Sequence, residues 1–466
     1  MRTPARTSWL LILAVLVAGC TTSHSHEPEV GGAPRRPEKP VVETERRPAE
    51  GPLTLSEAIH VALANNPDVA AAAWDSEAAQ ARYDYAVGAR WPKLSAVGSY
   101  AHHLDKQRLL PVQQPGDPST LSQDIFSGDL VLTMPIFTGG RLVNQIEAAE
   151  LLREAANHRL ARSREELVFN VSSVFLSILA QREVIESLEF SQKALGEHLK
   201  RVDDLIAVEK AAKVDRLRTE VRLADVQQQL VEEKNVMAIQ HRALVSLLGI
   251  EGQSGSPAIE GDLDVEEDVS VPELEKALTA AWSGRDDYLA ARSALEAQAH
   301  NVDAARAGRS PTVFLQGSYG GRWAAGPTTT GTAKELDDIG RIGIGAEIPI
   351  FEGGQINAQV QEQRAILAAA RERLRKLELQ IRLDIETALL NIRSSHERVV
   401  AIQTAVEQAQ ESLRIERERY DLGKGAIVDV LDAQSALLDS QTNYYRALAD
   451  MSVARAQLAL ATGEQQ

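Results

Sequence analysis

The chain repeats itself once, and this internal duplication constrains its fold more than any other feature. Residues 58–68 resemble residues 277–287, and the likeness resumes at intervals over the rest of the sequence. A repeat of this length is far longer than the repeat of a solenoid. The sequence therefore predicts one unit at residues 53–249, a linker rich in glycine, proline and acidic residues at 250–270, and a second copy of the unit at 271–463.

Each copy begins with helices and ends with two very long helical segments. Thr54 is followed three residues later by Glu57, which is typical of a capping box at the start of a helix. No proline occurs from Ile136 to Ser256 or from Ile350 to the end. A helix from about Arg141 to Leu205 would be about 95 Å long, and one from Gln355 to Tyr420 about 100 Å. Helices of this length must pack side by side as coiled coils.

Four stretches between these helices alternate polar and apolar residues, and we expect them to be strands. They lie at about 93–104, 126–136, 312–323 and 340–350. Segments of about ten residues with one apolar face are typical of outer-membrane strands, although a half-buried strand of a soluble sheet shows the same pattern. Four strands cannot close a barrel, and an open edge cannot face lipid.

Three chains would supply twelve strands, enough for a closed barrel. If the strands enter a membrane, the protein is therefore a homotrimer. The fold class that we predict is an α+β membrane protein. It combines a long α-helical coiled-coil tunnel with four transmembrane strands per chain, which contribute to a twelve-stranded trimeric barrel.

The first residues predict export and lipid attachment. Residues 1–19 combine a basic start with a short apolar run, which indicates a signal peptide. The only cysteine of the chain, Cys20, follows this run and resembles the acylated cysteine of a bacterial lipoprotein. We expect cleavage before Cys20, a covalent lipid on it as the only attached group, and a disordered proline-rich tether at residues 20–52.

Two sequence features carry a resemblance to a known family. The motif Pro-Ile-Phe-x-Gly-Gly occurs once in each copy, and the segment from Tyr420 to Gln434 reads YDLGKGAIVDVLDAQ. Together with the internal repeat, they resemble the TolC-like outer-membrane efflux family, in its lipoprotein branch. The resemblance implies a homotrimer in the outer membrane of a Gram-negative bacterium, extending into the periplasm. It also implies two partners, a periplasmic adaptor and an inner-membrane pump of the RND or ABC type.

The duplicated motif marks the junction between each second strand and the long helix that follows. Proline is expected to end strand pairing, the aromatic ring to lie at the membrane boundary, and the two glycines to allow a sharp turn. The junction residues are Pro135, Phe137, Gly139 and Gly140 in the first copy, and Pro349, Phe351, Gly353 and Gly354 in the second.

The resemblance places a periplasmic gate at the turns between the long helices. Asp429 and Asp432 match positions that form acidic rings, so six carboxylates from three chains would converge near one axis, attract cations and repel anions. Tyr420 and Asp215 match positions whose hydrogen bonding holds adjacent helices together. Gly425 stands where an arginine would complete this latch, and the neighbouring Lys424 is the expected substitute, as a point charge.

The predicted function is a passive exit duct of a tripartite efflux system. Two alternatives stay open: the outer-membrane component of a type I protein secretion system, and a periplasmic coiled-coil adaptor or scaffold. No catalytic, metal-binding or cofactor-binding pattern emerges, so we do not expect an enzyme. The net charge of −16 argues against a nucleic-acid partner.

Overall fold

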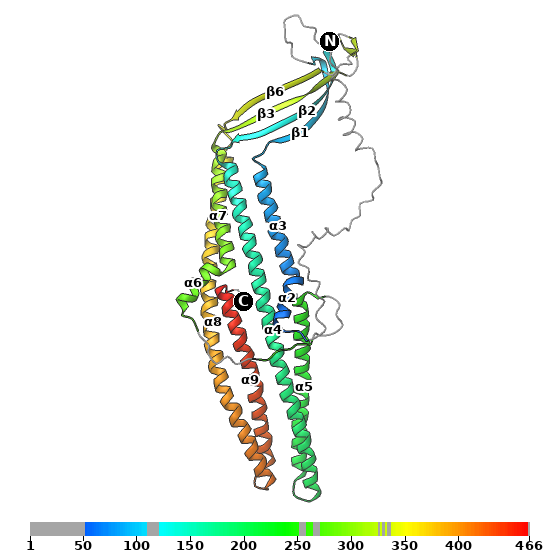
Figure 1. The fold of residues 1–466 in the computed structure, drawn as a ribbon, viewed down its shortest axis with the longest axis vertical. Coiled ribbons are helices and arrows are strands. Elements are labelled where there is room, and N and C mark those ends of the chain that lie inside the picture. Colours follow the sequence, from blue (N-terminus) through cyan, green and yellow to red (C-terminus); the bar gives the residue numbers. More distant parts are fainter. Residues whose placement is uncertain are drawn as a thin grey trace. The chain divides into compact units, whose positions relative to one another are not determined.

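A computed structural model describes residues 52–109, 121–250, 258–263, 271–324, 327–328, 331–332 and 337–464. The predicted signal peptide, Cys20 and nearly all of the predicted tether lie outside the described residues, so their assignments stay predictions. Within the described part, the element order of the first copy recurs in the second: two helices, two long strands and a hairpin of two long helices (Figure 1).

The first two helices of the described residues begin where the sequence offers caps. Helix α2 (Leu55–Asn65) has the expected capping box, in which the backbone N–H of Thr54 donates to the Glu57 carboxylate at 3.0 Å. Asn66 then ends α2 and caps α3 (Pro67–Gly88), because its side-chain oxygen accepts a hydrogen bond from the backbone of Asp68 at 2.8 Å. Proline at the first position of α3 costs no hydrogen bond there. The corresponding helices of the second copy are α6 (Leu274–Gly284) and α7 (Asp286–Arg306), followed by the short helix η1 (Ala307–Arg309).

Two helical hairpins make up most of the described chain. Helices α4 (Arg141–Ala207) and α5 (Lys213–Leu248) form the first, and α8 (Gln355–Asp421) and α9 (Ile427–Thr462) form the second. Helices α4 and α8 each contain 67 residues, which corresponds to about 100 Å of helix. The predicted long helices thus exist within a residue or two of their expected ends.

One antiparallel sheet connects the two copies. Its strand order is β1-β2-β3-β6, and a separate two-stranded sheet pairs β4 with β5. The strands are β1 (Lys93–Arg108), β2 (Leu121–Phe137), β3 (Thr312–Ala324), β4 (Pro327–Thr328), β5 (Gly331–Thr332) and β6 (Asp337–Glu347). The first two strands are longer than expected, and the short strands β4 and β5 were not expected. Strand β6 ends before Ile348-Pro349, three residues earlier than predicted, because proline has no N–H to donate to a sheet.

Apolar clusters hold the helices together in a pattern that follows the repeat. Phe175, Ile178 and Leu244 of the first hairpin pack on Ala58 and Ala62 of α2. In the second copy, a cluster of the same kind joins Ala277 and Ala281 of α6 to Ile381, Ile385 and Ala388 of α8. Among the described helices, α4 is the one with a stretch long and apolar enough to cross a membrane, and half of that stretch is buried inside the protein.

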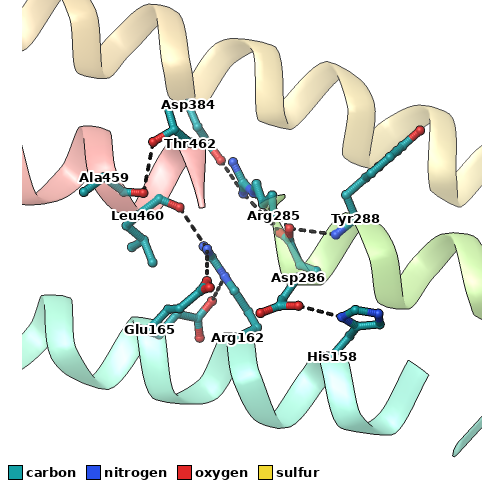
Figure 2. A network of polar contacts seen from close by, with 12 residues as sticks. His158, Arg162, Glu165, Arg285, Asp286, Tyr288, Asp384, Ala459, Leu460 and Thr462 are labelled. Atoms are coloured by element: carbon teal, nitrogen blue, oxygen red, sulfur yellow. Dashed lines mark hydrogen bonds and ion pairs between the residues drawn. The ribbon is translucent and has the colours of Figure 1, made fainter. Parts of the chain in front are cut away.

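A polar network lies where α4, α7, α8 and α9 meet (Figure 2). Arg285, only 4% exposed, donates to Asp287 at 2.9 Å and to Asp384 of α8 at 2.8 Å. Arg162 of α4 donates to the Leu460 carbonyl near the end of α9 at 3.0 Å, and His158 contacts Asp286 at 2.6 Å. These contacts tie the short helices of the second copy to both hairpins.

Candidate functional site

The sheet has one apolar face, and rings from three adjacent strands meet on it. Phe126 of β2 pairs with Tyr100 of β1 and with Trp323 of β3. The ring centroids of Tyr100 and Phe126 lie 4.7 Å apart, and those of Phe126 and Trp323 lie 5.2 Å apart. Offset or tilted rings at these separations attract one another beyond their burial. The row resembles one of the aromatic girdles that border the lipid band of a membrane barrel.

The apolar face has the height of a membrane. Phe126 and Ile136 are ten positions apart on β2, which corresponds to about 34 Å along an antiparallel strand. At the usual strand tilt of about 40°, this span covers about 26 Å perpendicular to the membrane, close to the roughly 25 Å band of outer-membrane barrels. Exposed side chains on this face include Leu94, Leu130, Tyr319, Ile342 and Ile344.

The opposite face is polar, as the alternation predicted. Arg322 of β3 donates from Nη1 to both carboxylate oxygens of Asp129 on β2 at 2.9 Å. The hydroxyls of Ser99 and Ser127 are hydrogen bonded across β1 and β2 at 2.6 Å. Water is the appropriate surrounding for this face, so one face of the sheet suits lipid and the other suits an aqueous lumen.

The duplicated motif forms the two strand-to-helix junctions, as expected. Gly139 and Gly140 have φ values of 63° and 89°, and Gly353 and Gly354 have values of 61° and 86°. Two successive left-handed residues form a tight turn, and α4 and α8 start immediately after them. Phe137 and Phe351 are both exposed beside these turns.

Proline ends strand pairing in only one of the two junctions. Pro349 lies beyond the end of β6, whereas Pro135 lies inside β2 and pairs with Phe314. The expectation that proline ends pairing was therefore wrong for Pro135. The register shifts between Pro135 and Phe137, so an irregularity in the ladder accommodates the residue that cannot donate.

The two predicted carboxylates at the hairpin turns cap the helices that follow. The backbone N–H of Ala212 donates to Asp215 at 3.1 Å, and that of Ala426 donates to Asp429 at 3.3 Å. Each carboxylate thus satisfies a free N–H at the start of α5 or α9 and lies at the positive end of that helix. Asp215 and Asp429 are equivalent in the two copies, which explains why both are acidic.

Asp432 lies one turn further along α9 and is exposed. It lines a groove of about 460 Å³ between α5 and α9, together with Arg218 and Arg222 of α5. The structure therefore places Asp429 and Asp432 on one exposed side of α9, while Val430 and Leu431 are buried. An acidic ring would need these two residues from each of three chains.

Tyr420 lies near the end of α8 and Asp215 near the start of α5. Burial, followed by the charges of Asp215 and Asp421, raises the pKa of Tyr420. The described hydrogen bond of Asp215 goes to the backbone N–H of Ala212. Lys424 is exposed in the turn between α8 and α9.

Sequence reasoning missed an ion pair beside this latch. Arg201 of α4 donates from Nη1 to both oxygens of Asp421, the last residue of α8, at 3.2 Å. The ring of His198 lies 5.5 Å from the ring of Tyr420. No motif marks Arg201 in the sequence. Only the predicted proximity of the two hairpin tips could have identified it.

Comparisons with known proteins agree with this geometry. A family described as outer membrane efflux protein matches residues 58–250 and 278–464. The chain is 21% identical to the outer membrane protein TolC of Vibrio cholerae, over 88% of this chain and 90% of the relative. It is 24% identical to the cobalt-zinc-cadmium resistance protein CzcC of Cupriavidus metallidurans, over 85% of this chain and 87% of the relative. The CmeC outer membrane channel of Campylobacter jejuni superposes with a TM-score of 0.76 at 18% identity, over 88% of this chain and 85% of the other.

These relationships explain the sheet with two open edges. In this fold, three chains close a twelve-stranded barrel in the outer membrane, and their long helices form a tunnel in the periplasm. The protein is accordingly a channel of an efflux system rather than a scaffold. Since the family match falls separately on each copy and covers most of both, both halves of this chain belong to the outer membrane efflux protein family.

Proposed function

We propose that the chain is the passive exit duct of a tripartite exporter. One observation carries this proposal. The lipid-facing sheet continues directly, through two glycine turns, into helices of 67 residues. A single chain therefore provides both a wall across the membrane and a wall that extends about 100 Å from it. A duct with these two walls would conduct a solute past the periplasm without releasing it there.

The duct has no energy source of its own, and this determines the partners that we propose. A passive channel does not supply energy, so transport requires an inner-membrane pump, of the RND or ABC type. A periplasmic adaptor would join that pump to the tips of α4–α5 and α8–α9. No cofactor is needed for this role, apart from the lipid that we propose on Cys20. Acyl chains there would anchor the chain independently of the barrel, since each buried CH₂ contributes about 0.8 kcal/mol.

The gate that we propose consists of Asp429 and Asp432 from three chains. Both side chains are exposed on α9 and three positions apart, so they lie on one side of the helix. Three copies around an axis would bring six carboxylates together, favour cations and raise the proton affinity of each carboxylate. Asp215, Tyr420 and Lys424 would hold the neighbouring helix ends, with Asp215 and Asp429 also capping their own helices.

Single-channel recording tests the duct directly. The full-length protein, extracted from outer membranes and inserted into planar lipid bilayers, should give discrete cation-selective current steps. Export should also be restored when the chain is expressed with its own pump and adaptor in a strain that lacks an outer-membrane duct. Purified trimers that insert into bilayers and never conduct would contradict the proposal.

A further inference from the structure

The groove near the starts of α5 and α9 has opposite charges at equivalent positions of the two copies. Asp215 of α5 is equivalent in the repeat to Asp429 of α9, so that Arg218 is equivalent to Asp432. Arg218 and Asp432 both line this groove of about 460 Å³. Asp215 is half-buried and is not one of the residues that line it. The repeated position that faces the groove therefore carries a base in the first copy and an acid in the second.

Arg218 and Asp432 lie at the same distance from the starts of their helices. Arg218 is the sixth residue of α5, which begins at Lys213, and Asp432 is the sixth residue of α9, which begins at Ile427. At 1.5 Å per residue, each lies about 8 Å along its helix. The turns that precede α5 and α9 lie at the same end of the two hairpins (Figure 1). An axis that brings three copies of Asp432 together therefore brings three copies of Arg218 to the same level.

The guanidinium of Arg218 has no carboxylate partner among the ion pairs that the structure describes, whereas those of its neighbours do. Arg216 pairs with Asp203 of α4 at 3.1 Å. Arg222, which also lines the groove, has Asp225 within 4.0 Å. Arg218 is exposed. Its positive charge is therefore available to act on solutes and ions in the groove.

We infer that Arg218 sets the charge selectivity of the gate by offsetting the field of Asp432. The inference rests on the proposed function, because it matters only if the starts of α5 and α9 surround a pore. Three chains would place three guanidiniums among the six carboxylates of Asp429 and Asp432, which halves the net negative charge of these groups. The duct then admits anionic solutes as well as cations, whereas six carboxylates alone would repel anions.

The apolar lining of the groove strengthens the effect of these charges. Leu217 and Val221 of α5 and Val428 of α9 line it beside Arg218 and Asp432. Apolar side chains lower the local dielectric constant, so a charge acts more strongly there than in open water. Salt screens exposed charges over about 10 Å at 0.1 M and about 3 Å at 1 M. The contribution of Arg218 to selectivity should therefore be large at low salt and small at high salt.

Reversal potentials across planar lipid bilayers test the sign of this effect. In a gradient of KCl at low ionic strength, Arg218→Gln should raise the ratio of K⁺ to Cl⁻ permeability by about twofold or more, because the carboxylates are no longer offset. Arg218→Lys keeps the charge and should leave the ratio close to that of the wild type. Arg216→Gln is the matched control. It removes the same charge from the same helix, but Arg216 pairs with Asp203 and does not line the groove, so the ratio should change little.

An exchange of charges between the two copies distinguishes selectivity from a structural role. Arg218→Asp should raise the permeability ratio further than Arg218→Gln does. Adding Asp432→Arg restores one charge of each sign at the equivalent positions and should return the ratio to within about twofold of the wild type. A second substitution of this kind would not repair a purely structural defect.

The outcomes distinguish this inference from the proposed function. An unchanged ratio in Arg218→Gln overturns the inference and leaves the duct intact, and so does an exchanged pair as cation-selective as Arg218→Asp. If Arg218→Gln does not assemble, the exchanged pair is compared with Asp432→Arg alone. Adding Arg218→Asp should then raise the ratio, and the absence of a rise overturns the inference. Wild-type trimers that insert into bilayers and never conduct would instead contradict the duct, and this inference with it.

Discussion

Arg285 Nη2 donates to Asp384 Oδ2 at 2.8 Å and thereby joins the start of α7 to the middle of α8. The guanidinium is 4% exposed and also donates to Asp287 at 2.9 Å. Burying a charge is costly even when carboxylates compensate it, and removing one member of such a group leaves the remaining charges uncompensated. This contact therefore fixes the second pair of short helices against the second hairpin (Figure 2).

Arg285→Ala should destabilise the trimer strongly. We expect a loss of roughly 3–5 kcal/mol in the free energy of unfolding, because Asp287 and Asp384 lose their buried cation. Thermal unfolding of detergent-purified trimers, followed by circular dichroism, measures this change. Arg382→Ala is the control on α8, because Arg382 is 55% exposed and its described ion pair is with Glu386 of the same helix. Equal effects of the two variants would show that Arg285 does not support this junction.

The two junctions should respond differently to the same substitution. A Cβ on Gly139 would approach Ser310 Cβ to 2.1 Å, whereas a Cβ on Gly353 would meet nothing within 4 Å. Gly353→Ala should therefore cost only the strain of a left-handed alanine, about 1–2 kcal/mol. Gly139→Ala should lower the free energy of unfolding by clearly more than Gly353→Ala does, because Ser310 must also move. Thermal unfolding of both variants decides this, and equal melting temperatures would be inconsistent with the close approach at Gly139.

Glu165 makes stability depend on pH. Burial and the nearby Asp286 raise its pKa, although Arg162 acts in the opposite direction. The folded state therefore binds this proton more tightly than the unfolded state. The stabilisation is complete below the usual carboxyl pKa and is lost as the pH rises through the higher folded value.

Glu165→Gln should accordingly have a melting temperature at least as high as that of the wild type at pH 7.5. When the pH is lowered to 5, the melting temperature of Glu165→Gln should rise by less than that of the wild type. Glu166→Gln is the control, because Glu166 also pairs with Arg162 but is 54% exposed. Melting temperatures across this pH range provide the comparison. A wild type that becomes less stable relative to Glu165→Gln on acidification would reverse the assigned sign.

The acidic ring can be tested without disturbing the helix caps. Asp429→Asn keeps an oxygen that can accept the Ala426 N–H, so the double variant Asp429→Asn with Asp432→Asn removes charge and retains the cap. We expect reversal potentials in a salt gradient to show a clear loss of cation selectivity. Asp215→Asn, which alters the equivalent cap in the first copy, should leave selectivity unchanged. Unaltered selectivity in the double variant would remove the ring from the gate.

The proposed lipid on Cys20 can be tested by metabolic labelling with palmitate. The wild-type chain should incorporate radioactive palmitate, and Cys20→Ser should not, because Cys20 is the only cysteine. A chain exported with a cleavable signal and Cys20→Ser should still reach the outer membrane through its barrel. Palmitate incorporation into Cys20→Ser would contradict the anchor.

The regular features of this chain were predictable because they repeat. Proline-free runs located the four long helices, and alternation located the four long strands, since each pattern extends over ten or more residues. The capping box at Thr54 and the glycine turns were readable for a local reason, because few residue types suit those backbone positions.

The features that sequence did not reveal depend on contacts between distant segments. Arg201 and Asp421 are separated by 220 residues, and nothing near either residue distinguishes this pair from the many charged pairs on helix surfaces. Pro135 remains in β2 because the irregular ladder between β2 and β3 accommodates it. Burial of Arg285 likewise depends on α8 lying beside the start of α7, which periodicity does not specify.

The number of chains in one particle tests the central claim most directly. Native mass spectrometry of the protein, extracted from outer membranes in mild detergent, should give three chains per complex, because three sheets of four strands close one barrel of twelve. A population that consists of single chains or pairs would contradict the twelve-stranded barrel, and with it the duct and the acidic ring.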